Sequence, residues 1–570
     1  MNYFEVQDRN EREIEMRLSH SVMNKTCRDV YDAFNQIVNK NLLLGEGNII
    51  DADPIQATQI LQESVSSIEK ELNDWVQGYS SMRWLWMLRR LPRHIFAGKL
   101  SSTAPYDQTL AEIFSAQSNQ FYSGLQRSDS QIHYDISGAV LTRLARFCAG
   151  IKYLSDLHSY LRWAGKGSRF HFSSTSMPKV ISDKDLEKAV NLYDQRRASS
   201  GMPFSRGGTR LANLVVDQLT STDILRVDRM QQEDISLPNE FMQTLGAEFS
   251  SNTYWKLRVN FMPSLVSLAP LQDLQKDQRL RDIKIWSSDA GIVALLLRIA
   301  PIYLKEHRAG LFSLCTRGYL LIPKIKFLNL ADELLSLHDS WINETLINKP
   351  NLKSGVEFLL ELESLKGISY PLKPGPVLRT DQDMICLDLA MATQRLDCSF
   401  EYTNAQGKTA NARAYHFEIT VQKSIDSSQW KPKPEIAKFR GRDLFLNGKK
   451  ITDIDSIGEK DGKLLIVDCK SIIYSSNYDI GDYTTVRNTR TEIERKVKEW
   501  QKVKETLKQN PVGDNYNFSK YRDILAVVCI PGVVFLHIGS TTEEIDPNLR
   551  VVSSLIEIEK WLGINPQGES

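Results

Sequence analysis

The feature that most constrains how this chain can fold is an Asp461-Gly462 pair between two strand-like runs near its C-terminus. Asp-Gly is one of the pairs that two-residue hairpin turns prefer, because both turn positions need a positive φ. If these two residues form the loop, Lys460 faces Lys463, and every further facing pair follows by counting outward from the turn. The pair therefore predicts the register of two strands as well as their presence.

That register brings two acidic side chains together. Counting outward places Asp455 directly opposite Asp468. It also places Asp453 opposite Lys470, and both pairs are non-hydrogen-bonded, the kind in which side chains approach most closely. Alternation along the strands puts all four side chains on one face. Two carboxylates whose Cβ atoms are about 4.5–5.5 Å apart repel each other, so strands that needed only stability would avoid this arrangement.

A divalent cation between the two carboxylates would remove this repulsion, and hard oxygen ligands suit Mg²⁺ or Mn²⁺. Such a cation lowers the pKa of a coordinated water, and an adjacent lysine can hold or polarise that water. Phosphodiester hydrolysis requires a nucleophile at neutral pH and stabilisation of a developing negative charge. The facing carboxylates and the lysine therefore indicate a metal-dependent phosphodiesterase site.

The order of elements around the hairpin can be predicted from the apolar pattern. Apolar residues at helical spacing predict helices, and short apolar runs between turn residues predict strands. A second hairpin signal, Asn447-Gly448, precedes the first one. The expected order is a helix, three strands, a helix and a strand, at Ala412–Asp426, Arg442–Asn447, Lys450–Gly458, Lys463–Lys470, Thr491–Gln509 and Ile524–Ile530.

The run ITDIDSIGEKDGKLLIVDCKS resembles the core of the PD-(D/E)XK nuclease superfamily, which has the restriction-endonuclease-like fold. The family pattern is an acidic residue on one strand and (Asp/Glu)-x-Lys at the end of the next strand. Asp455 matches the first acid, Asp468 the second acid and Lys470 the lysine. Glu418 matches a glutamate that many members carry on the preceding helix, with an exposed helix glutamate as the alternative. Ile454 stands where the nominal motif has a proline, a position that varies widely in the family.

The resemblance implies a cofactor and a role for each matched residue. Asp455 and Asp468 would be ligands of a Mg²⁺ or Mn²⁺ ion, and the carbonyl oxygen of Cys469 would be a further ligand. Lys470 would position the attacking water. For Asp453, a cross-strand ion pair with Lys470 is favoured over direct metal ligation.

The first two-thirds of the chain contains no chemical motif. Helical periodicity predicts helices at Glu11–Lys40, Ile55–Gln77, Gly138–Trp163, Asp183–Arg197, Ala290–Leu304 and Leu328–Ile347. The segment Tyr370–Asp383 is rich in proline and is interpreted as a linker or domain edge, and Asn404–Asn411 is a second polar break. We therefore expect a mixed α+β and α/β protein. A large, mainly helical region (1–400) would precede a restriction-endonuclease-like α/β domain (405–565).

Two segments of the N-terminal region admit more than one interpretation. The stretch Tyr79–Ala97 is dense in tryptophan and arginine, and stacked aromatics with arginines can bind single-stranded nucleic acid. A core helix with arginines at its rim is the favoured interpretation. The apolar run Gly291–Leu304 is short and is interrupted by Arg298 and Pro301, so a buried helix is expected rather than a membrane span.

Charge and cysteine content exclude some classes of protein. The formal net charge is +1, so global charge indicates no partner. Residues 408–508 hold 21 Lys and Arg against 15 Asp and Glu. This excess could form a phosphate-facing surface or simply a solvated helix face. Because the seven cysteines form no CxxC pair, neither a disulfide framework nor a structural zinc site is expected. A reducing, cytoplasmic location fits best.

The expected function is hydrolysis of phosphodiester bonds by a Mg²⁺- or Mn²⁺-dependent endo- or exonuclease, with DNA as the expected nucleic acid. Nuclease cores fused to a large unassigned region are common among bacterial defence proteins of this superfamily, so anti-phage defence is the context that the resemblance implies. Residues 1–400 would recognise a partner, regulate the enzyme, or mediate homo-oligomer assembly. The alternative is a non-cleaving nucleic-acid-binding or interaction protein built on a nuclease-like fold.

Overall fold

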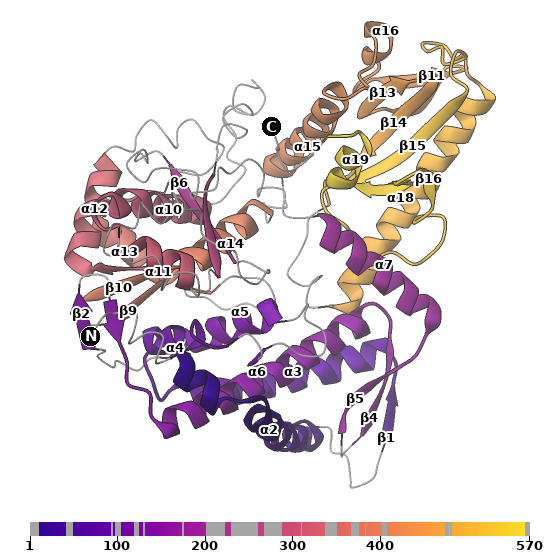
Figure 1. Cartoon of the computed structure of the whole chain (residues 1–570). Helices are drawn as coiled ribbons and strands as arrows, with labels where there is room; N and C mark the ends of the chain where they lie inside the picture. Colours follow the sequence, from indigo (N-terminus) through magenta and orange to yellow (C-terminus); the bar gives the residue numbers. More distant parts are fainter. Residues whose placement is uncertain are drawn as a thin grey trace.

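The chain is a mixed α+β protein that combines long helices with several small sheets. Figure 1 shows the N-terminal elements, coloured indigo to salmon, as a larger body beside the C-terminal elements in orange and yellow. This computed structural model describes residues 11–41, 49–92, 95–96, 104–118, 125–128, 131–173, 176–200, 223–229, 260–266, 288–308, 310–336, 350–365, 375–381, 383–401, 407–472, 478 and 481–564.

The first half of the N-terminal body is a helical layer with a small sheet at its edge. Its elements are α2 (His20–Asn41), β1 (Ile49–Ala52), α3 (Pro54–Val76), α4 (Ser81–Leu88), α5 (Ala104–Ser115), β2 (Leu125–Ser128), β3 (Gln131–His133), α6 (Gly138–Gly165), β4 (Arg169–Ser173), β5 (Ser176–Ile181) and α7 (Lys184–Ser200). Helix α3 starts where Asp53 accepts hydrogen bonds from two amides of the first turn, in a capping box with Gln56. Gly150 of α6 lets the two long helices approach, since an added Cβ would lie 2.6 Å from Leu72 Cδ2 of α3.

The second half of the body surrounds a buried helix. Its elements are β6 (Ile224–Arg229), β7 (Phe261–Val266), α10 (Ser288–Glu306), α11 (Gly310–Arg317), β8 (Tyr319–Pro323), α12 (Lys324–Ser336), α13 (Gly355–Ser364), β9 (Leu378–Asp381), β10 (Met384–Asp388) and α14 (Leu389–Glu401). The expected buried helix is confirmed as α10, with Pro301 inside it and Arg298 only 2 % exposed. Among the residues that the structure describes, no helix is both long enough and apolar enough to cross a membrane.

The other expected helices are present with shifted ends. Helices α3, α6 and α7 match three of the predicted ranges. The first range, Glu11–Lys40, is split, because a short helix over residues 11–17 ends before α2 begins at His20. Helix α12 matches the sixth range up to Ser336, and residues 337–347 lie outside the described part of the chain. The linker interpretation of Tyr370–Asp383 is wrong for its second half, because β9 pairs there with β10, with Val377 and Leu378 buried. The prediction of a polar break over Asn404–Asn411 is also wrong from Gly407 onward, where helix α15 (Gly407–Asp426) begins.

The arginines of the Trp/Arg-rich stretch are buried rather than placed at a rim. The core-helix interpretation is confirmed by α4, but Arg83, Arg89 and Arg90 are only 5 %, 3 % and 6 % exposed. Arg83 donates to the carbonyl of Asp135, and Arg90 lies with its guanidinium 4.0 Å from the centre of the Trp86 ring. The sequence pattern did not indicate this burial, because the compensating groups come from distant parts of the chain.

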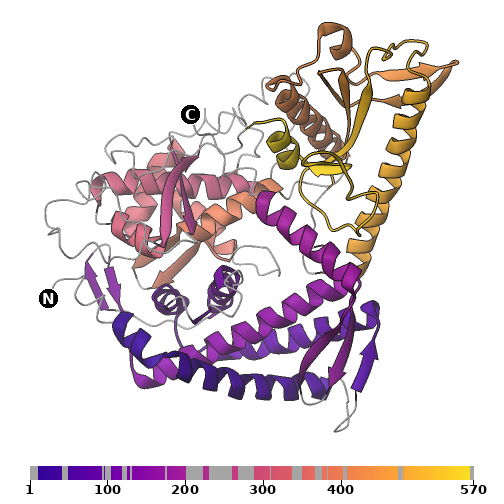
Figure 2. The ribbon, with the colours of Figure 1, turned by 45° about the vertical axis from the view of Figure 1, so that its right-hand side comes forward.

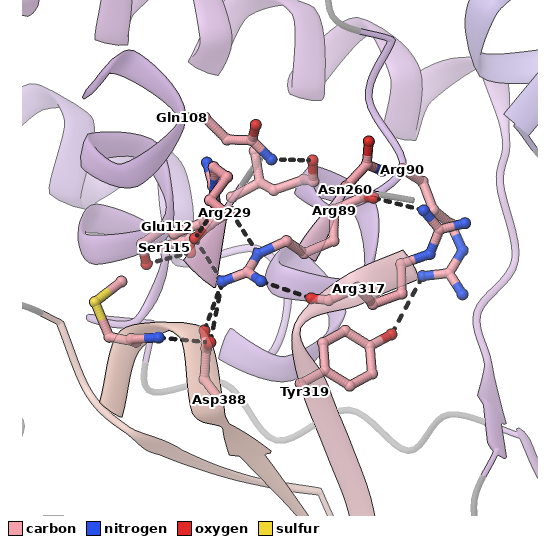
Figure 3. Close-up of polar contacts among 12 residues, drawn as sticks. Arg89, Arg90, Gln108, Glu112, Ser115, Arg229, Asn260, Arg317, Tyr319 and Asp388 are labelled. Atoms are coloured by element: carbon pink, nitrogen blue, oxygen red, sulfur yellow. Dashed lines mark hydrogen bonds and ion pairs between the residues drawn. The ribbon is translucent and has the colours of Figure 1, made fainter. Parts of the chain in front are cut away.

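The compensating groups of Arg89 form a buried network that joins the two halves of the body (Figure 3). The guanidinium of Arg89 donates to both carboxylate oxygens of Glu112, at 2.6 and 2.8 Å, and to both of Asp388, at 3.1 and 2.9 Å. It also donates to the carbonyl of Arg317 at 2.6 Å. Arg229 of β6 adds a second guanidinium to Glu112. Burial disfavours the charge of Glu112, but Arg229 and Arg89 outweigh that cost and lower its pKa.

The C-terminal elements form a four-stranded sheet with helices on both faces. They are α15, α16 (Pro434–Ala437), β11 (Asp443–Leu446), β12 (Lys449–Asp453), β13 (Ser456–Lys460), β14 (Lys463–Cys469), α18 (Tyr483–Gln509), β15 (Asp523–Ile530), β16 (Glu544–Asp546), β17 (Leu549–Arg550), β18 (Val552–Ser554) and α19 (Leu555–Trp561). The sheet order is β13-β14-β15-β18, and β11 pairs with β12 in a separate hairpin. The apolar stripe of α15 packs on one face of the sheet, and α18 packs on the other.

Helix α7 joins the N-terminal body to the C-terminal sheet. Its side chains Leu186, Ala189, Val190 and Tyr193 belong to the same apolar cluster as α18 and the α18-facing residues of the sheet. Arg196 of α7 donates to both oxygens of Glu557 in α19, at 2.7 and 2.9 Å. Figure 2 shows α18 descending from the sheet to the end of α6. At that end an added Cβ on Gly165 would lie 2.0 Å from the carbonyl oxygen of Gly481, so the two backbones touch.

The Arg89 network generates a stability prediction. Arg89→Leu should destabilise the body by about 3–5 kcal/mol, because it leaves the Asp388 carboxylate buried without its hydrogen-bonded cation. Arg169→Leu, at an exposed position of β4, should change the free energy of unfolding by no more than about 0.5 kcal/mol. Urea unfolding of both variants beside the wild type measures the difference. Equal effects of the two substitutions would show that the network adds nothing to stability.

The free energy of unfolding should depend on pH through the ionisation of Asp107 in α5. Burial raises the pKa of Asp107 to about 7, while a hydrogen bond from Ser155 partly opposes the shift. The folded state therefore favours the protonated carboxyl. The resulting stabilisation is complete below the ordinary pKa near 3.9 and is lost as the pH rises through about 7.

Asp107→Asn tests this assignment because asparagine stays neutral and still accepts from Ser155. The Tm of Asp107→Asn relative to wild type should rise between pH 4 and about pH 7, the window over which wild-type Asp107 ionises. A difference in Tm that stays constant over this window would contradict the raised pKa.

Candidate active site at the end of strand β14

Both predicted hairpin turns are present with the geometry that their sequences require. Asn447 and Gly448 have φ values of 52° and 71°, and Asp461 and Gly462 have φ values of 49° and 75°. Two consecutive positive φ angles define the type I′ turn, whose twist matches that of the flanking strands. The two turns therefore confirm the hairpins that the sequence indicated.

The register of the second hairpin is the predicted one. Lys460 faces Lys463 next to the turn, and the pairing runs unshifted to Ser456 opposite Val467. One further step in the same register would place Asp455 opposite Asp468, beyond the last paired residues. The single strand expected over Lys450–Gly458 is wrong, because the chain bends between β12 and β13 and changes its pairing partner there.

The bend gives the carboxylate of Asp455 a defined task. In the extended ladder, the amide of Cys469 would donate to the carbonyl of Ile454. That carbonyl instead accepts from the amide of Gly441 at 2.7 Å. Asp455 Oδ2 takes its place and accepts from the amide of Cys469 at 2.6 Å. The side chain of Asp455 therefore reaches across to β14, beside Asp468, and its Oδ1 accepts no hydrogen bond from a described residue.

Lys470 pairs with Asp468 rather than with Asp453. Lys470 Nζ donates to Asp468 Oδ1 at 2.7 Å, at the end of β14. Asp453 lies on β12, where its carboxylate is 59 % exposed and 3.7 Å from Lys450 Nζ. The predicted cross-strand ion pair between Asp453 and Lys470 is therefore wrong, because the bend moves β12 away from β14.

Glu418 lies on α15 within electrostatic reach of this group. Burial raises the pKa of Glu418, Lys470 opposes the shift, and Asp453 and Asp468 reinforce it. The carbonyl of Glu418 also accepts from the hydroxyl of Ser456, the first residue of β13, at 3.3 Å. The structure thus brings Asp455, Asp468, Lys470 and Glu418 to one end of the sheet.

The charges of these residues influence one another. Burial raises the pKa of Asp455 to about 7, and the nearby carboxylates of Glu418 and Asp468 add to the increase. For Lys470, burial opposes the charged form, but Asp468 and Asp455 outweigh burial and raise its pKa. The cluster therefore places three acidic side chains beside one lysine, and a bound cation would favour the ionised forms of these acids.

The donor set fits a hard divalent cation that takes only a few of its ligands from the protein. Asp455 supplies carboxylate oxygens from the bend before β13 and Asp468 supplies them from β14, and the backbone carbonyl of Cys469 lies between Asp468 and Lys470 in sequence. The thiol of Cys469 packs on the α15 face with Leu465 and Val467, so it does not belong to this donor set. Within the described residues, no three His, Cys, Asp or Glu side chains gather as a ligand group. A cation here would depend on two side chains, a carbonyl, and oxygens from water or substrate.

Gln422 was not predicted from the sequence, although it lies one helical turn after Glu418. This side chain of α15 is 8 % exposed and hydrogen bonds to both backbone groups of Ile457 in β13. Spacing of four residues from a candidate catalytic glutamate was the available signal. The signal was not specific, because buried glutamine side chains occur on many helices.

Comparisons with known proteins yield no relative: no family model, no curated protein and no solved structure matches this chain.

Substitution of Asp455 or Asp468 should lower metal affinity, whereas substitution of Asp453 on β12 should not. Asp455→Asn and Asp468→Asn each remove one anionic ligand while keeping the side-chain shape. Each should weaken Mn²⁺ binding by more than the roughly 10–100-fold typical of losing an outer-shell partner. Asp453→Asn should leave the affinity unchanged, because that carboxylate is exposed and paired with Lys450. Calorimetric titration checks this, and equal loss in all three variants would contradict the assigned ligands.

Proposed function

We propose that residues 405–565 form a metal-dependent nuclease of the PD-(D/E)XK type that hydrolyses phosphodiester bonds, with DNA as the expected substrate. The observation that carries the proposal is the meeting of Asp455 and Asp468 with Lys470 at the end of β14. The element order supports it, since α15, the strands β11 to β14, α18 and β15 follow one another along the chain. The mixed strand pairing of the sheet also agrees with this proposal, because β14 is antiparallel to β13 and parallel to β15.

Each residue of the site has a chemical task in this proposal. Asp455 and Asp468 would hold Mg²⁺ or Mn²⁺, together with the carbonyl of Cys469. Once bound, the ion would supply charge that stabilises the transition state and would lower the pKa of a coordinated water. Lys470 orients the attacking water and offsets negative charge that develops on the phosphate. Glu418, on the facing helix, accepts hydrogen bonds from water in the same space.

The N-terminal body would supply recognition or regulation. It contacts the nuclease domain through α7 and through the segment at Gly481, which lies between Lys470 and α18. A nuclease core joined to a large body of this kind agrees with a role in anti-phage defence, in the cytoplasm, with a protein partner or a second copy of the chain bound by the body. These assignments rest on analogy with the resembled superfamily.

A non-cleaving nucleic-acid-binding protein built on the same fold is the second candidate. The ion pair between Lys470 and Asp468 favours it, because that pair already satisfies one of the two carboxylates. Among the described residues, Asp455 and Glu418 form no ion pair, which favours the nuclease. Metal binding and cleavage therefore separate the two candidates.

Cleavage assays with matched variants test the nuclease. Wild-type protein, Asp468→Ala and Asp453→Ala are incubated with plasmid, linear duplex, single-stranded DNA and RNA in Mg²⁺ or Mn²⁺. Wild type and Asp453→Ala should cut, and Asp468→Ala should lose cleavage, because of these two aspartates only Asp468 is assigned as a ligand of the cation. The Tm of Asp468→Ala should stay close to that of wild type, since a partly exposed ion pair contributes about 1 kcal/mol or less.

Three results would count against the nuclease. Cleavage that survives in Asp468→Ala would point to a contaminating enzyme or another site. Loss of cleavage in Asp453→Ala would contradict the assignment of the ligands. Binding of nucleic acid without metal binding or cleavage by wild type would favour the second candidate.

A further inference from the structure

We propose that Gln422 is the positioning residue that fixes the bend before β13 and thereby directs the carboxylate of Asp455 toward β14. The proposal rests on the proposed function of that carboxylate as a metal ligand. It concerns a residue that touches neither the metal position nor the scissile bond, and its action passes through the backbone of β13.

Strand β13 is an edge strand, so half of its backbone groups face away from the sheet. With the hairpin register observed, Ser456, Gly458 and Lys460 pair with β14, and Ile457 and Glu459 point outward. Buried outward groups need other partners, since an unpaired amide or carbonyl costs about 1–3 kcal/mol. The position of β13 therefore depends on what lies along this edge.

Gln422 satisfies both outward groups of Ile457. Its Oε1 accepts from the amide of Ile457 at 2.9 Å, and its Nε2 donates to the carbonyl of Ile457 at 3.1 Å. The primary amide of glutamine thus copies the donor and acceptor of a neighbouring strand. Because Gln422 is 8 % exposed, water is poorly placed to replace either bond.

Two contacts between backbone groups also lie along this edge. The amide of Glu459 donates to the carbonyl of Trp430 at 3.0 Å, and the amide of Gly441 donates to the carbonyl of Ile454 at 2.7 Å. Gln422 is the side chain that pairs with the outward-facing amide and carbonyl of Ile457. Substituting it can therefore remove these hydrogen bonds of β13 while the backbone remains the same. Gln422 lies between these two backbone contacts, next to the bend.

Gln422 also reaches the other side of the bend. Its Nε2 donates to Asp426 Oδ1 at 2.9 Å, and Asp426 forms an ion pair with Arg440. Arg440 is bridged to Ile454 through the backbone. One side chain of α15 is thus linked to the residue before Asp455 and hydrogen-bonded to Ile457 after Ser456. The backbone of Asp455 is held from both directions.

The consequence for the site is geometric. Asp455 Oδ2 reaches the amide of Cys469 only if the backbone at the bend stays close to β14. A shift of β13 along its edge would move this carboxylate away from Asp468. Outer-shell partners of metal ligands typically contribute 10–100-fold in metal affinity or activity, and we assign Gln422 to this range.

The test compares Gln422→Met, which keeps the length and removes the two hydrogen bonds to Ile457 and the one to Asp426, with Gln429→Met as the matched control. Gln429 is an exposed glutamine just beyond α15 that accepts from Lys460. Hydrogen exchange measured by mass spectrometry should accelerate in Gln422→Met for peptides that contain Ile457 and Cys469. Exchange in β15 should stay as in wild type. Mn²⁺ affinity should fall by about 10–100-fold.

Gln422→Glu guards against a variant that fails to fold. A carboxylate still accepts from the amide of Ile457 but repels its carbonyl, so an intermediate acceleration at Cys469 is expected. Wild-type exchange at Cys469 in both Gln422 variants would overturn the proposal. Equal acceleration in Gln429→Met would also overturn it, because the effect would then not be specific to the bend.

The same experiment distinguishes this proposal from the proposed nuclease function. Wild-type protein that neither binds Mn²⁺ nor cuts nucleic acid would refute the nuclease. The exchange of the Cys469 amide would still decide whether Gln422 directs Asp455. Normal metal binding by Gln422→Met with unchanged exchange would refute the positioning role and leave the nuclease standing.

Discussion

A buried arginine holds the N-terminal body in one arrangement. Arg89 follows α4, and its partners Glu112, Arg317 and Asp388 come from α5, α11 and the end of β10. A guanidinium in a water-free interior must have its donors paired with good geometry, since a partner lost there costs several kcal/mol. The four elements are therefore fixed relative to one another, although almost 300 residues separate Arg89 from Asp388 in sequence. Asp388 ends β10, the central strand of the sheet β8-β10-β9, so the network is connected directly to that sheet.

The C-terminal site depends on a different requirement, the pairing of backbone groups. Where β12 bends into β13, the carbonyl of Ile454 turns to Gly441, and the amide of Cys469 would be left without a partner. The carboxylate of Asp455 fills this place, and its direction follows from hydrogen bonding. The same bend separates Asp453 from Lys470. A single change in strand pairing thus determines which acids meet and which acid stays outside.

The body and the sheet meet on the α18 side of this site. Side chains of helix α7 pack into the apolar cluster of the sheet. Arg196 of α7 also forms an ion pair with Glu557 at the start of α19. Gly481 touches the end of α6 with a backbone φ of +78°, and an added Cβ would lie 2.6 Å from the carbonyl oxygen of Leu161. Gly481 belongs to the segment that connects Lys470 with α18. The N-terminal body therefore packs against Gly481, eleven residues after the proposed catalytic lysine.

The amino-acid sequence by itself determined the local geometry of the candidate site. Asp461-Gly462 set the hairpin and its register, because few residue pairs tolerate two positive φ angles, and the register placed Asp455 opposite Asp468. Helices such as α3 and α10 could also be predicted locally, because the spacing of apolar residues along the sequence is enough to indicate a helix. The tertiary structure alone decided the partner of Lys470, the burial of Arg89 and the role of Gln422. These depend on groups that are distant in sequence, and local patterns carry no information about which distant groups will complete a hydrogen bond or balance a charge.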